Sequence, residues 1–217
     1  MHEKSRLCPA RIILGSEQTL TNDKGEVRIL SDRLRKVVVL GGGSAGWLVA
    51  GLLACEHPDL HITLIESSDV PIIGVGEGTW PSMRDTLRRL GLSESEFVRQ
   101  CHVSFKQGSR FDGWMRGDDG AQGDRYYHPF MLPVGHGDVD LVQAWLATQP
   151  QRPFAEVVSP SVQVCEAGRG PKQVQTPEFG AVANYAYHFD AGRFGQMLRE
   201  HACQKLGVHH VVDHVDA

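Results

Sequence analysis

The sequence predicts an α/β fold built on a parallel sheet, and two neighbouring stretches carry that prediction. Residues 37–47 read Val-Val-Val-Leu-Gly-Gly-Gly-Ser-Ala-Gly-Trp, which is the pattern of a buried strand, a glycine-rich turn and the start of a helix. A second apolar and β-branched run follows at residues 61–66. Strands joined through one helix lie parallel in a sheet, so residues 36–66 are expected to form a β-α-β unit.

The turn between the first strand and the helix has glycine at the three positions of a G-x-G-x-x-G pattern. Gly41 permits a tight turn, Gly43 lets bare backbone approach a phosphate, and Gly46 lets the helix pack closely on the strand. The start of the helix offers unpaired N–H groups and the positive end of its dipole to an anion. The turn therefore predicts a site for the pyrophosphate of a dinucleotide, and the alternative is a purely structural turn.

An acidic residue ends the second strand. Glu66 lies 20 residues after Gly46, which is the usual place for a carboxylate that accepts hydrogen bonds from the adenosine ribose hydroxyls. A free 2′-hydroxyl fits FAD or NAD, because a 2′-phosphate would be repelled by the carboxylate. The alternative is a solvated acid at the end of a strand.

Composition narrows the class of protein. The chain has 217 residues, 41% of them hydrophobic and 22% charged, which is ordinary for a globular protein with one or two domains. A net charge of −4 gives no reason to expect binding to nucleic acid or to a membrane surface. The five cysteines are scattered and form no C-x-x-C pair, so a cytoplasmic protein with reduced thiols is expected. No apolar run is long enough for a transmembrane helix, and residues 1–35 lack the core of a signal peptide.

The remaining elements follow from local signals. Helices are expected from Ser44 to Glu56, from Pro81 to about Leu90, from a Ser93 cap to near Cys101, and from an Asp190 cap to about Leu206. Strands are expected over residues 103–114 and 208–215. The sheet looks unfinished at Ala217, because a doubly wound sheet normally has further strands.

Five motifs occur in an order that resembles one family. They are Gly41–Trp47, Gly74–Pro81, Ser104-Phe105-Lys106, Tyr127-His128-Pro129-Phe130 and Tyr187-His188-Phe189-Asp190. Together they resemble the flavin-dependent halogenases of the tryptophan halogenase type, over about residues 36–217. The resemblance implies a Rossmann-like FAD-binding fold of the flavin monooxygenase type. It also implies that the fold is incomplete at the C-terminus and carries an irregular and helical insertion on the substrate side.

The resemblance divides the chain into four parts. Residues 1–34 are an N-terminal extension, and residues 35–114 are the FAD-binding β-α-β unit with the flavin-proximal loop and the strand of the catalytic lysine. Residues 115–182 are the insertion, and residues 183–217 return to the FAD-binding domain.

The resemblance also implies an activity. The family is a group of oxidoreductases that use reduced FAD, O₂ and halide to make hypohalous acid, which reaches a lysine beside an electron-rich aromatic such as tryptophan or another indole. A separate flavin reductase would supply the reduced FAD. Chloride and bromide both stay open as the halide, as do the substrate, its reacting carbon and a homodimeric state.

Residues of the cofactor site carry over from the family by matching motifs. The residues that would hold the FAD pyrophosphate are Gly41, Gly43, Ser44, Ala45 and Gly46. Glu66 would face the adenosine ribose, and Val215 matches a backbone contact near the adenine. The loop from Gly74 to Thr79 matches the family's G-V-G-E-A-T loop against the flavin, with Gly78 in place of alanine.

Residues of the substrate site carry over in the same way. Lys106 matches the catalytic lysine, and His128 and Phe130 match a histidine and a phenylalanine that stack on the substrate ring. An ammonium group can polarise the hypohalous acid, or an amine can form a haloamine, and either holds the electrophile at one ring carbon. The alternatives are a surface lysine and ordinary packing. No metal is expected, since neighbours such as His209 and His210 point to opposite faces of a strand.

Some parts of the family pattern do not occur in this sequence. The W-x-W-x-I-P motif is absent, and so is the later region with the glutamate that assists the lysine. The chain is therefore expected to be an N-terminal portion that is inactive alone. Two alternatives stay open, a non-catalytic nucleotide-binding remnant and a flavin-dependent hydroxylase. Lys106 disfavours the hydroxylase, because hydroxylases transfer oxygen directly from the flavin.

Overall fold

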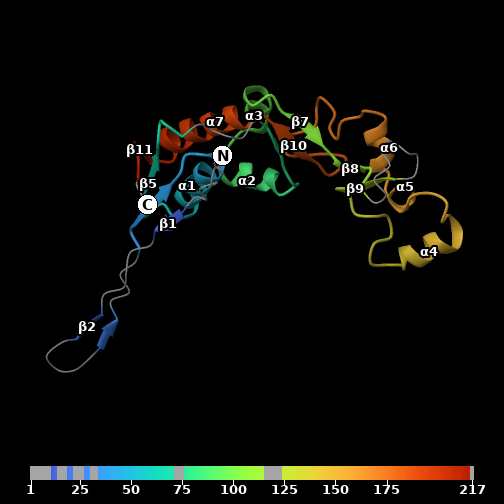
Figure 1. Cartoon of the computed structure of the whole chain (residues 1–217), viewed down its shortest axis with the longest axis horizontal. Helices are drawn as coiled ribbons and strands as arrows, with labels where there is room; N and C mark the ends of the chain where they lie inside the picture. The colour runs from blue at the N-terminus through green and yellow to red at the C-terminus, as the bar shows by residue number, and fades with distance from the viewer. Residues whose placement is uncertain are drawn as a thin grey trace, which may run out of the picture. The chain divides into compact units, whose positions relative to one another are not determined.

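The computed structural model describes residues 11–13, 19–21, 27–29, 34–70, 76–114 and 124–215 (Figure 1). The chain divides into two compact units. The first unit comprises Met1–Gly76, Arg89–Gly91 and Asp190–Ala217, and the second comprises Glu77–Arg88 and Leu92–Phe189.

A four-stranded sheet organises the first unit, in the order β1-β4-β5-β11. The central strands β4 (Lys36–Leu40) and β5 (His61–Glu66) run parallel, and β11 (His209–Val212) continues the parallel arrangement beside β5. Strand β1 (Arg11–Ile13) pairs antiparallel with β4. The predicted α/β fold with a parallel β-α-β unit is therefore confirmed.

One helix covers the apolar side chains of this sheet, and a second helix packs on the first. Helix α1 (Ser44–Glu56) has the predicted bounds and lies against β4 and β5, where Val39 and Leu64 are fully buried. Helix α7 (Ala191–Lys205) packs along α1 (Figure 1). The side chain of Asp190 caps α7 by accepting a 2.9 Å hydrogen bond from the backbone N–H of Arg193, as predicted.

The ends of the first unit differ in part from the prediction. The last strand ends at Val212 rather than Val215, because only four residues of β11 align with β5. In the N-terminal extension, β2 (Thr19–Thr21) and β3 (Val27–Ile29) pair antiparallel. Apart from β1, β2 and β3, positions 1–33 lie outside the described residues.

The second unit contains two antiparallel sheets. Its three-stranded sheet has the order β6-β10-β7, formed by β6 (Glu77–Gly78), β10 (Ala186–Phe189) and β7 (Ser104–Lys106). Its two-stranded sheet pairs β8 (Gly108–Asp112) with β9 (Arg125–Pro129).

Five short helices accompany these sheets. They are α2 (Met83–Arg89, whose last residue belongs to the first unit), α3 (Glu94–Gln100), α4 (Leu141–Thr148), α5 (Phe154–Val158) and α6 (Ser161–Glu166). The predicted Ser93 cap of α3 is present, because the Ser93 hydroxyl accepts a hydrogen bond from the Glu96 N–H at 3.2 Å.

The single strand predicted over residues 103–114 is wrong. It is divided at Gln107 into β7 and β8, which belong to different sheets. Gly108 permits the change of partner, because a Cβ there would lie only 2.8 Å from the backbone oxygen of His128 on β9. The expected irregular segment 115–182 holds three short helices, but it also contains β9, which was not predicted.

The three-stranded sheet has two different faces because its side chains alternate. Tyr187 and Phe189 of β10 pack on Phe97 of α3, with ring centroids 5.1 and 5.3 Å apart. The intervening His188 is exposed on the other face and lies opposite Gly78 of β6. Lys106 of β7 pairs with Ala186, so it shares the face of His188.

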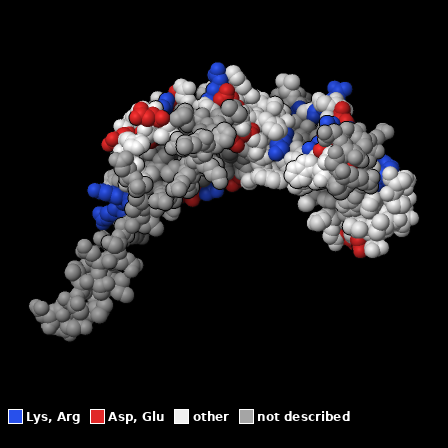
Figure 2. Space-filling view, in the orientation of Figure 1, with Lys and Arg blue, Asp and Glu red and all other residues white. Residues whose placement is uncertain are grey.

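Charged side chains are dispersed over the one face of the molecule that Figure 2 shows. Acidic and basic groups are interspersed on the face shown in Figure 2, where neither sign forms one broad patch among the described residues. None of the described helices is both long enough and apolar enough to cross a lipid bilayer.

Candidate functional site

The glycine turn of the first unit has the geometry that its sequence predicts. Gly41 has a φ of +106°, a conformation that favours glycine, and its N–H donates to the oxygen of Ile65 at 2.8 Å. A Cβ on Gly46 would lie 1.9 Å from the backbone oxygen of Gly41 and 3.7 Å from a methyl group of Leu64. Only glycine therefore lets α1 begin this close to β4 and β5.

Gly43 leaves the start of α1 open to a ligand. It is the N-cap residue of α1, and its side of the turn has nothing within 4 Å of the place where a Cβ would be. The N-cap residue makes no side-chain capping hydrogen bond within the part of the chain that the structure describes, and the first turn contains no acidic residue. A 13-residue helix that presents bare N–H groups to open space fits an anion such as a pyrophosphate.

Glu66 lies directly beside this turn. A Cβ on Gly42 would lie only 1.4 Å from the Oε2 atom of Glu66, so the carboxylate occupies the space that glycine leaves. Its Oε1 atom lies 2.7 Å from Nε2 of His210 and 3.9 Å from a guanidinium nitrogen of Arg199. Sequence reasoning singled out neither Gly42 nor His210 for this site, although Gly42 is the middle residue of the glycine run.

The remaining predicted cofactor residues are Val215 and the loop from Gly74 to Thr79. The Asp213 N–H donates to the oxygen of Glu66 at 3.0 Å, which holds the chain beside β5 just before Val215. Val215 itself is about half exposed, at 49%. Of the predicted flavin-proximal loop, Gly74 and Val75 lie outside the described residues, whereas Gly78 forms part of β6 in the second unit.

Lys106 of the second unit faces aromatic rings. Its side chain is half-buried, and its Nζ atom lies 5.5 Å from the ring centroid of Phe130 and 5.7 Å from that of Trp80. These distances suit cation–π attraction, which keeps the ammonium group near the rings. The structure thus brings together Lys106 and Phe130, which are 24 positions apart in the chain.

Three rings form what we call the ring cluster: Trp80, His128 and Phe130. The centroid of Trp80 lies 5.6 Å from that of His128 and 5.5 Å from that of Phe130. The His128 and Phe130 rings are perpendicular and 6.2 Å apart, so both lie on one side of the chain as predicted. Trp80 was not predicted as a site residue, although it directly follows the glycine loop in the sequence.

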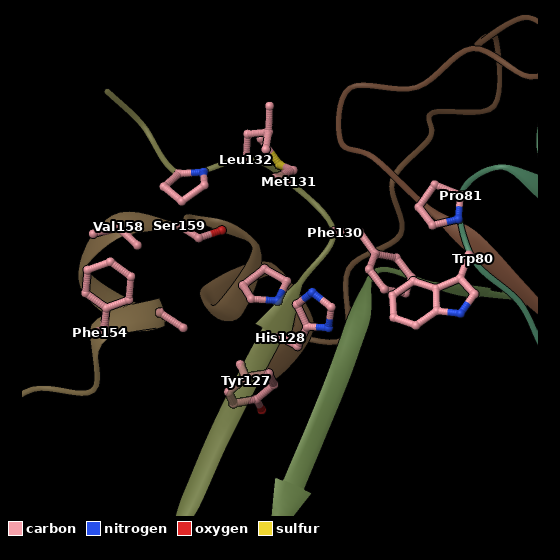
Figure 3. Close-up of a pocket in the computed structure, with 13 residues that line it drawn as sticks. Trp80, Pro81, Tyr127, His128, Phe130, Met131, Leu132, Phe154, Val158 and Ser159 are labelled. Atoms are coloured by element: carbon pink, nitrogen blue, oxygen red, sulfur yellow. The ribbon is translucent and has the colours of Figure 1, made fainter. Parts of the chain in front are cut away.

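An apolar cleft adjoins the ring cluster. It has a volume of about 470 Å³, and its lining includes all three rings together with side chains from α5. Figure 3 shows Trp80 at one end of the row of lining side chains and Phe154 at the other. None of the described residues that line the cleft is Lys, Arg, Asp or Glu. The cleft therefore favours a flat, uncharged group over an ion.

His188 and Gly78 lie at the same place on the sheet as Lys106. A Cβ on Gly78 would lie 3.1 Å from the His188 ring and 3.5 Å from Nζ of Lys106. Desolvation and the nearby Lys106 ammonium lower the pKa of His188. Sequence reasoning gave His188 no role, because only strand pairing reveals that it shares a face with Lys106.

A buried carboxylate supports the opposite face of this sheet. Glu94 accepts hydrogen bonds from the hydroxyls of Tyr185 and Tyr187 and from the Phe179 N–H, and it forms an ion pair with Lys172. Burial alone would raise the pKa of Glu94, but these partners hold it below its usual range. The network fixes β10 to α3, and no sequence signal pointed to it.

The fold and the two sites define an α/β protein of the dinucleotide-binding type that also carries a lysine among aromatic rings. The model of the tryptophan halogenase family matches residues 36–217, and the chain belongs to this family. The predicted family resemblance is therefore confirmed.

Individual relatives agree with this assignment. The chain is 32% identical to tryptophan 7-halogenase RebH of Lentzea aerocolonigenes, over 86% of this chain and 37% of that protein. Its structure resembles that of a tryptophan halogenase from Shewanella frigidimarina, with a TM-score of 0.79 and 48% identity over 84% of this chain and 37% of the other. It also resembles Xcc4156, a flavin-dependent halogenase from Xanthomonas campestris, with a TM-score of 0.70 and 30% identity over 84% of this chain and 36% of the other. The chain thus spans little more than a third of the length of these relatives.

Proposed function

We propose that this chain contributes the FAD-binding turn and the catalytic lysine to halogenation of an electron-rich aromatic, such as tryptophan or another indole. The observation that carries the proposal is the position of Lys106, whose Nζ faces Phe130 at 5.5 Å and Trp80 at 5.7 Å beside an uncharged cleft. The names of the relatives support the same chemistry.

The first unit offers a fitting site for FAD. Gly41, Gly43, Ser44, Ala45 and Gly46 would hold the pyrophosphate, because the helix start is open and uncapped by side chains. Glu66 would accept hydrogen bonds from the ribose, and Val215 would line the adenine end. Reduced FAD, together with O₂ and halide, would supply hypohalous acid.

Lys106 then controls where the halogen goes. As an ammonium group it donates a hydrogen bond to the oxygen of hypohalous acid and polarises the oxygen–halogen bond. As an amine it takes the halogen with release of water and later passes it to the ring. In both routes the ring carbon gains the halogen and loses a proton, and Lys106 decides which carbon is close enough.

The ring cluster would hold the substrate. Flat faces of His128 and Phe130 suit an indole, since offset or edge-to-face rings attract one another. Trp80 adds a third ring that is 57% exposed and so available to a ligand. A hydroxylase would need no lysine at this place, because it transfers oxygen to the substrate directly.

The proposal also includes a partner protein and a cellular location. A flavin reductase would supply reduced FAD, and the location would be the cytoplasm, where Cys55, Cys165 and Cys203 would stay free thiols.

A chimera tests this proposal directly. Residues 36–217 of this chain would replace the matching residues of the Shewanella frigidimarina halogenase, which is 48% identical to them. With a flavin reductase, FAD, chloride or bromide and tryptophan or indole, the chimera is expected to give a halogenated product detectable by mass spectrometry.

In the chimera, Lys106→Met should lower the rate of halogenation at least about 100-fold. The matched change Lys205→Met, at an exposed site on α7, should leave it unaltered. A folded chimera that binds FAD but halogenates equally with and without Lys106 would refute the proposal.

A further inference from the structure

The backbone of Phe130 is held by hydrogen bonds on both sides. Its N–H donates to the oxygen of Gln107 at 3.0 Å, and its carbonyl accepts from the side-chain amide of Asn184 at 2.8 Å. Strand β9 ends at Pro129, so Phe130 lies beyond the last residue of its ladder. Asn184 therefore supplies the partner that a neighbouring strand would otherwise provide.

The first of these bonds ties Phe130 to the strand of Lys106. Gln107 directly follows Lys106, is 7% exposed, and donates from its side chain to the oxygen of Arg169 at 2.6 Å. This side of the connection is rigid, because Gln107 is buried and bonded in two directions. The position of the Phe130 ring then depends on the other side, where Asn184 holds the carbonyl.

Asn184 is itself oriented by Arg84. An Arg84 guanidinium nitrogen donates to the side-chain oxygen of Asn184, which directs the Asn184 NH₂ group at the carbonyl of Phe130. The guanidinium lies over the ring of Tyr185, 4.4 Å from its centroid, and this stacking limits its movement. Tyr185 is fully buried, so the chain of contacts ends on a fixed core residue.

Arg84 and Asn184 also line a second cleft, which shares residues with the first. Phe130, Met131 and Leu132 line both the 470 Å³ cleft and a second cleft of about 500 Å³, whose lining includes Arg84 and Asn184. The segment 130–132 thus borders both clefts, and Asn184, which bonds to Phe130, lines only the 500 Å³ cleft of the two.

We propose that Asn184, oriented by Arg84, is a positioning residue that sets where the Phe130 ring lies and thereby how an aromatic substrate is presented to Lys106. This role rests on the proposed function, since it assigns the same ring cluster to the substrate. Asn184 acts through Phe130 and contacts neither Lys106 nor the substrate.

The chain offers a variant that separates the two bonds of Asn184. Asn184→Asp keeps the size of the side chain and the acceptor for Arg84, but a carboxylate cannot donate to the Phe130 carbonyl. Asn184→Ala removes both bonds. Gln163→Glu is a matched control, because Gln163 also donates from its amide to a backbone oxygen, that of Glu156, at 3.0 Å in the same unit.

Two readouts on the purified 217-residue chain test the proposal. The first is the NMR shift of labelled Phe130 ring protons, which the Trp80 ring current displaces and which needs no ligand. The second is the Kd for indole. Asn184→Asp is expected to move the Phe130 signals and weaken indole binding about five- to tenfold, since a lost hydrogen bond is worth about that factor. Gln163→Glu should change neither quantity.

The results distinguish the substrate role of the ring cluster from the positioning role of Asn184. If wild type binds no indole but Asn184→Asp still moves the Phe130 signals, the ring cluster of this chain does not bind the substrate by itself while the positioning of Phe130 stands, and the chimera decides the proposed function separately. If Asn184→Asp is folded and leaves both the signals and the Kd unchanged, the positioning role is refuted. Should the Asn184 variants not fold, Arg84→Lys decides, because losing the planar stack on Tyr185 should shift the same Phe130 signals in the same direction by less. Unmoved signals in a folded Arg84→Lys variant would then overturn the proposal.

Discussion

Adding one methyl group to the glycine turn should affect the stability of the fold differently at two positions that are three residues apart. In Gly46→Ala the new Cβ would lie 1.9 Å from the backbone oxygen of Gly41, about 1.5 Å short of ordinary contact. A carbonyl in a tight turn cannot rotate away as a side chain could, so α1 must move off the sheet. In Gly43→Ala the new Cβ meets nothing within 4 Å, so the fold can accept it.

The expected change in the free energy of unfolding of Gly46→Ala is the difference between a cost of overpacking and a gain in helix propensity. Overpacking typically costs about 1–3 kcal/mol, and a backbone clash belongs at the upper end of that range. Alanine is preferred over glycine inside a helix by roughly 1 kcal/mol, which offsets part of the cost because Gly46 is a residue of α1. Gly46→Ala should therefore lower the free energy of unfolding by about 2 kcal/mol, which lowers the Tm by roughly 4–8 °C for a chain of this size. Gly43→Ala should change the free energy of unfolding by less than about 0.5 kcal/mol.

Thermal unfolding and FAD titration of the purified chain together test this reasoning. Gly43→Ala should keep the wild-type Tm but weaken FAD binding at least about tenfold, because its methyl group occupies the open side of the helix start. Gly46→Ala should lower both the Tm and the affinity. A Gly46→Ala chain as stable as wild type would refute the packing argument. A Gly43→Ala chain that binds FAD as tightly as wild type would refute the placement of the pyrophosphate.

Three further predictions concern the second unit. Lys106→Met should raise the pKa of His188 in an NMR titration without restoring its ordinary value, because the charge is removed while the larger effect, desolvation, remains. Glu94→Gln should lower the free energy of unfolding by about 3–5 kcal/mol in urea, since Lys172, whose side chain is only 12% exposed, loses its counter-ion; a loss below about 1 kcal/mol would contradict this. Hydrogen bonds lower the pKa of Glu94, and those from Ser93 and Ser95 lower that of Glu178 to about 2. Both groups thus contribute stability that is present above the usual glutamate pKa of 4.5 and is lost as the pH falls through their lowered pKa values, which for Glu178 means toward about 2, so the Tm should drop as the pH falls below 4.5.

Local signals accounted for the elements that were predicted well. Helix α1 begins and ends at the predicted residues, because the glycine turn and an Ala- and Leu-rich run define it without distant partners. Ser93 and Asp190 cap their helices as predicted, because a cap needs only the residue three positions later. The division at Gln107 could not be predicted in this way. It depends on β9 and β10, which approach from much later positions in the chain.

The candidate sites show the same division. The turn residues Gly41 and Gly46 and the acid Glu66 follow from spacing, whereas Lys106 and Phe130 were found only through the order of family motifs. The setting of Lys106 depends on residues without a local signal. Trp80 reaches it from the second residue after β6, and His188 reaches it from β10.

The sequence by itself determined the strand–turn–helix with its open helix start, because φ angles, caps and apolar periodicity act over a few residues. Only the tertiary structure decided which side chains meet. The register of β6, β10 and β7 brings Gly78, His188 and Lys106 to one face. Asn184 holds Phe130 from 54 positions away. Such contacts depend on strand pairing and on the burial of Tyr185 and Tyr187. Both are properties of the whole fold, so no short segment of the sequence predicts them.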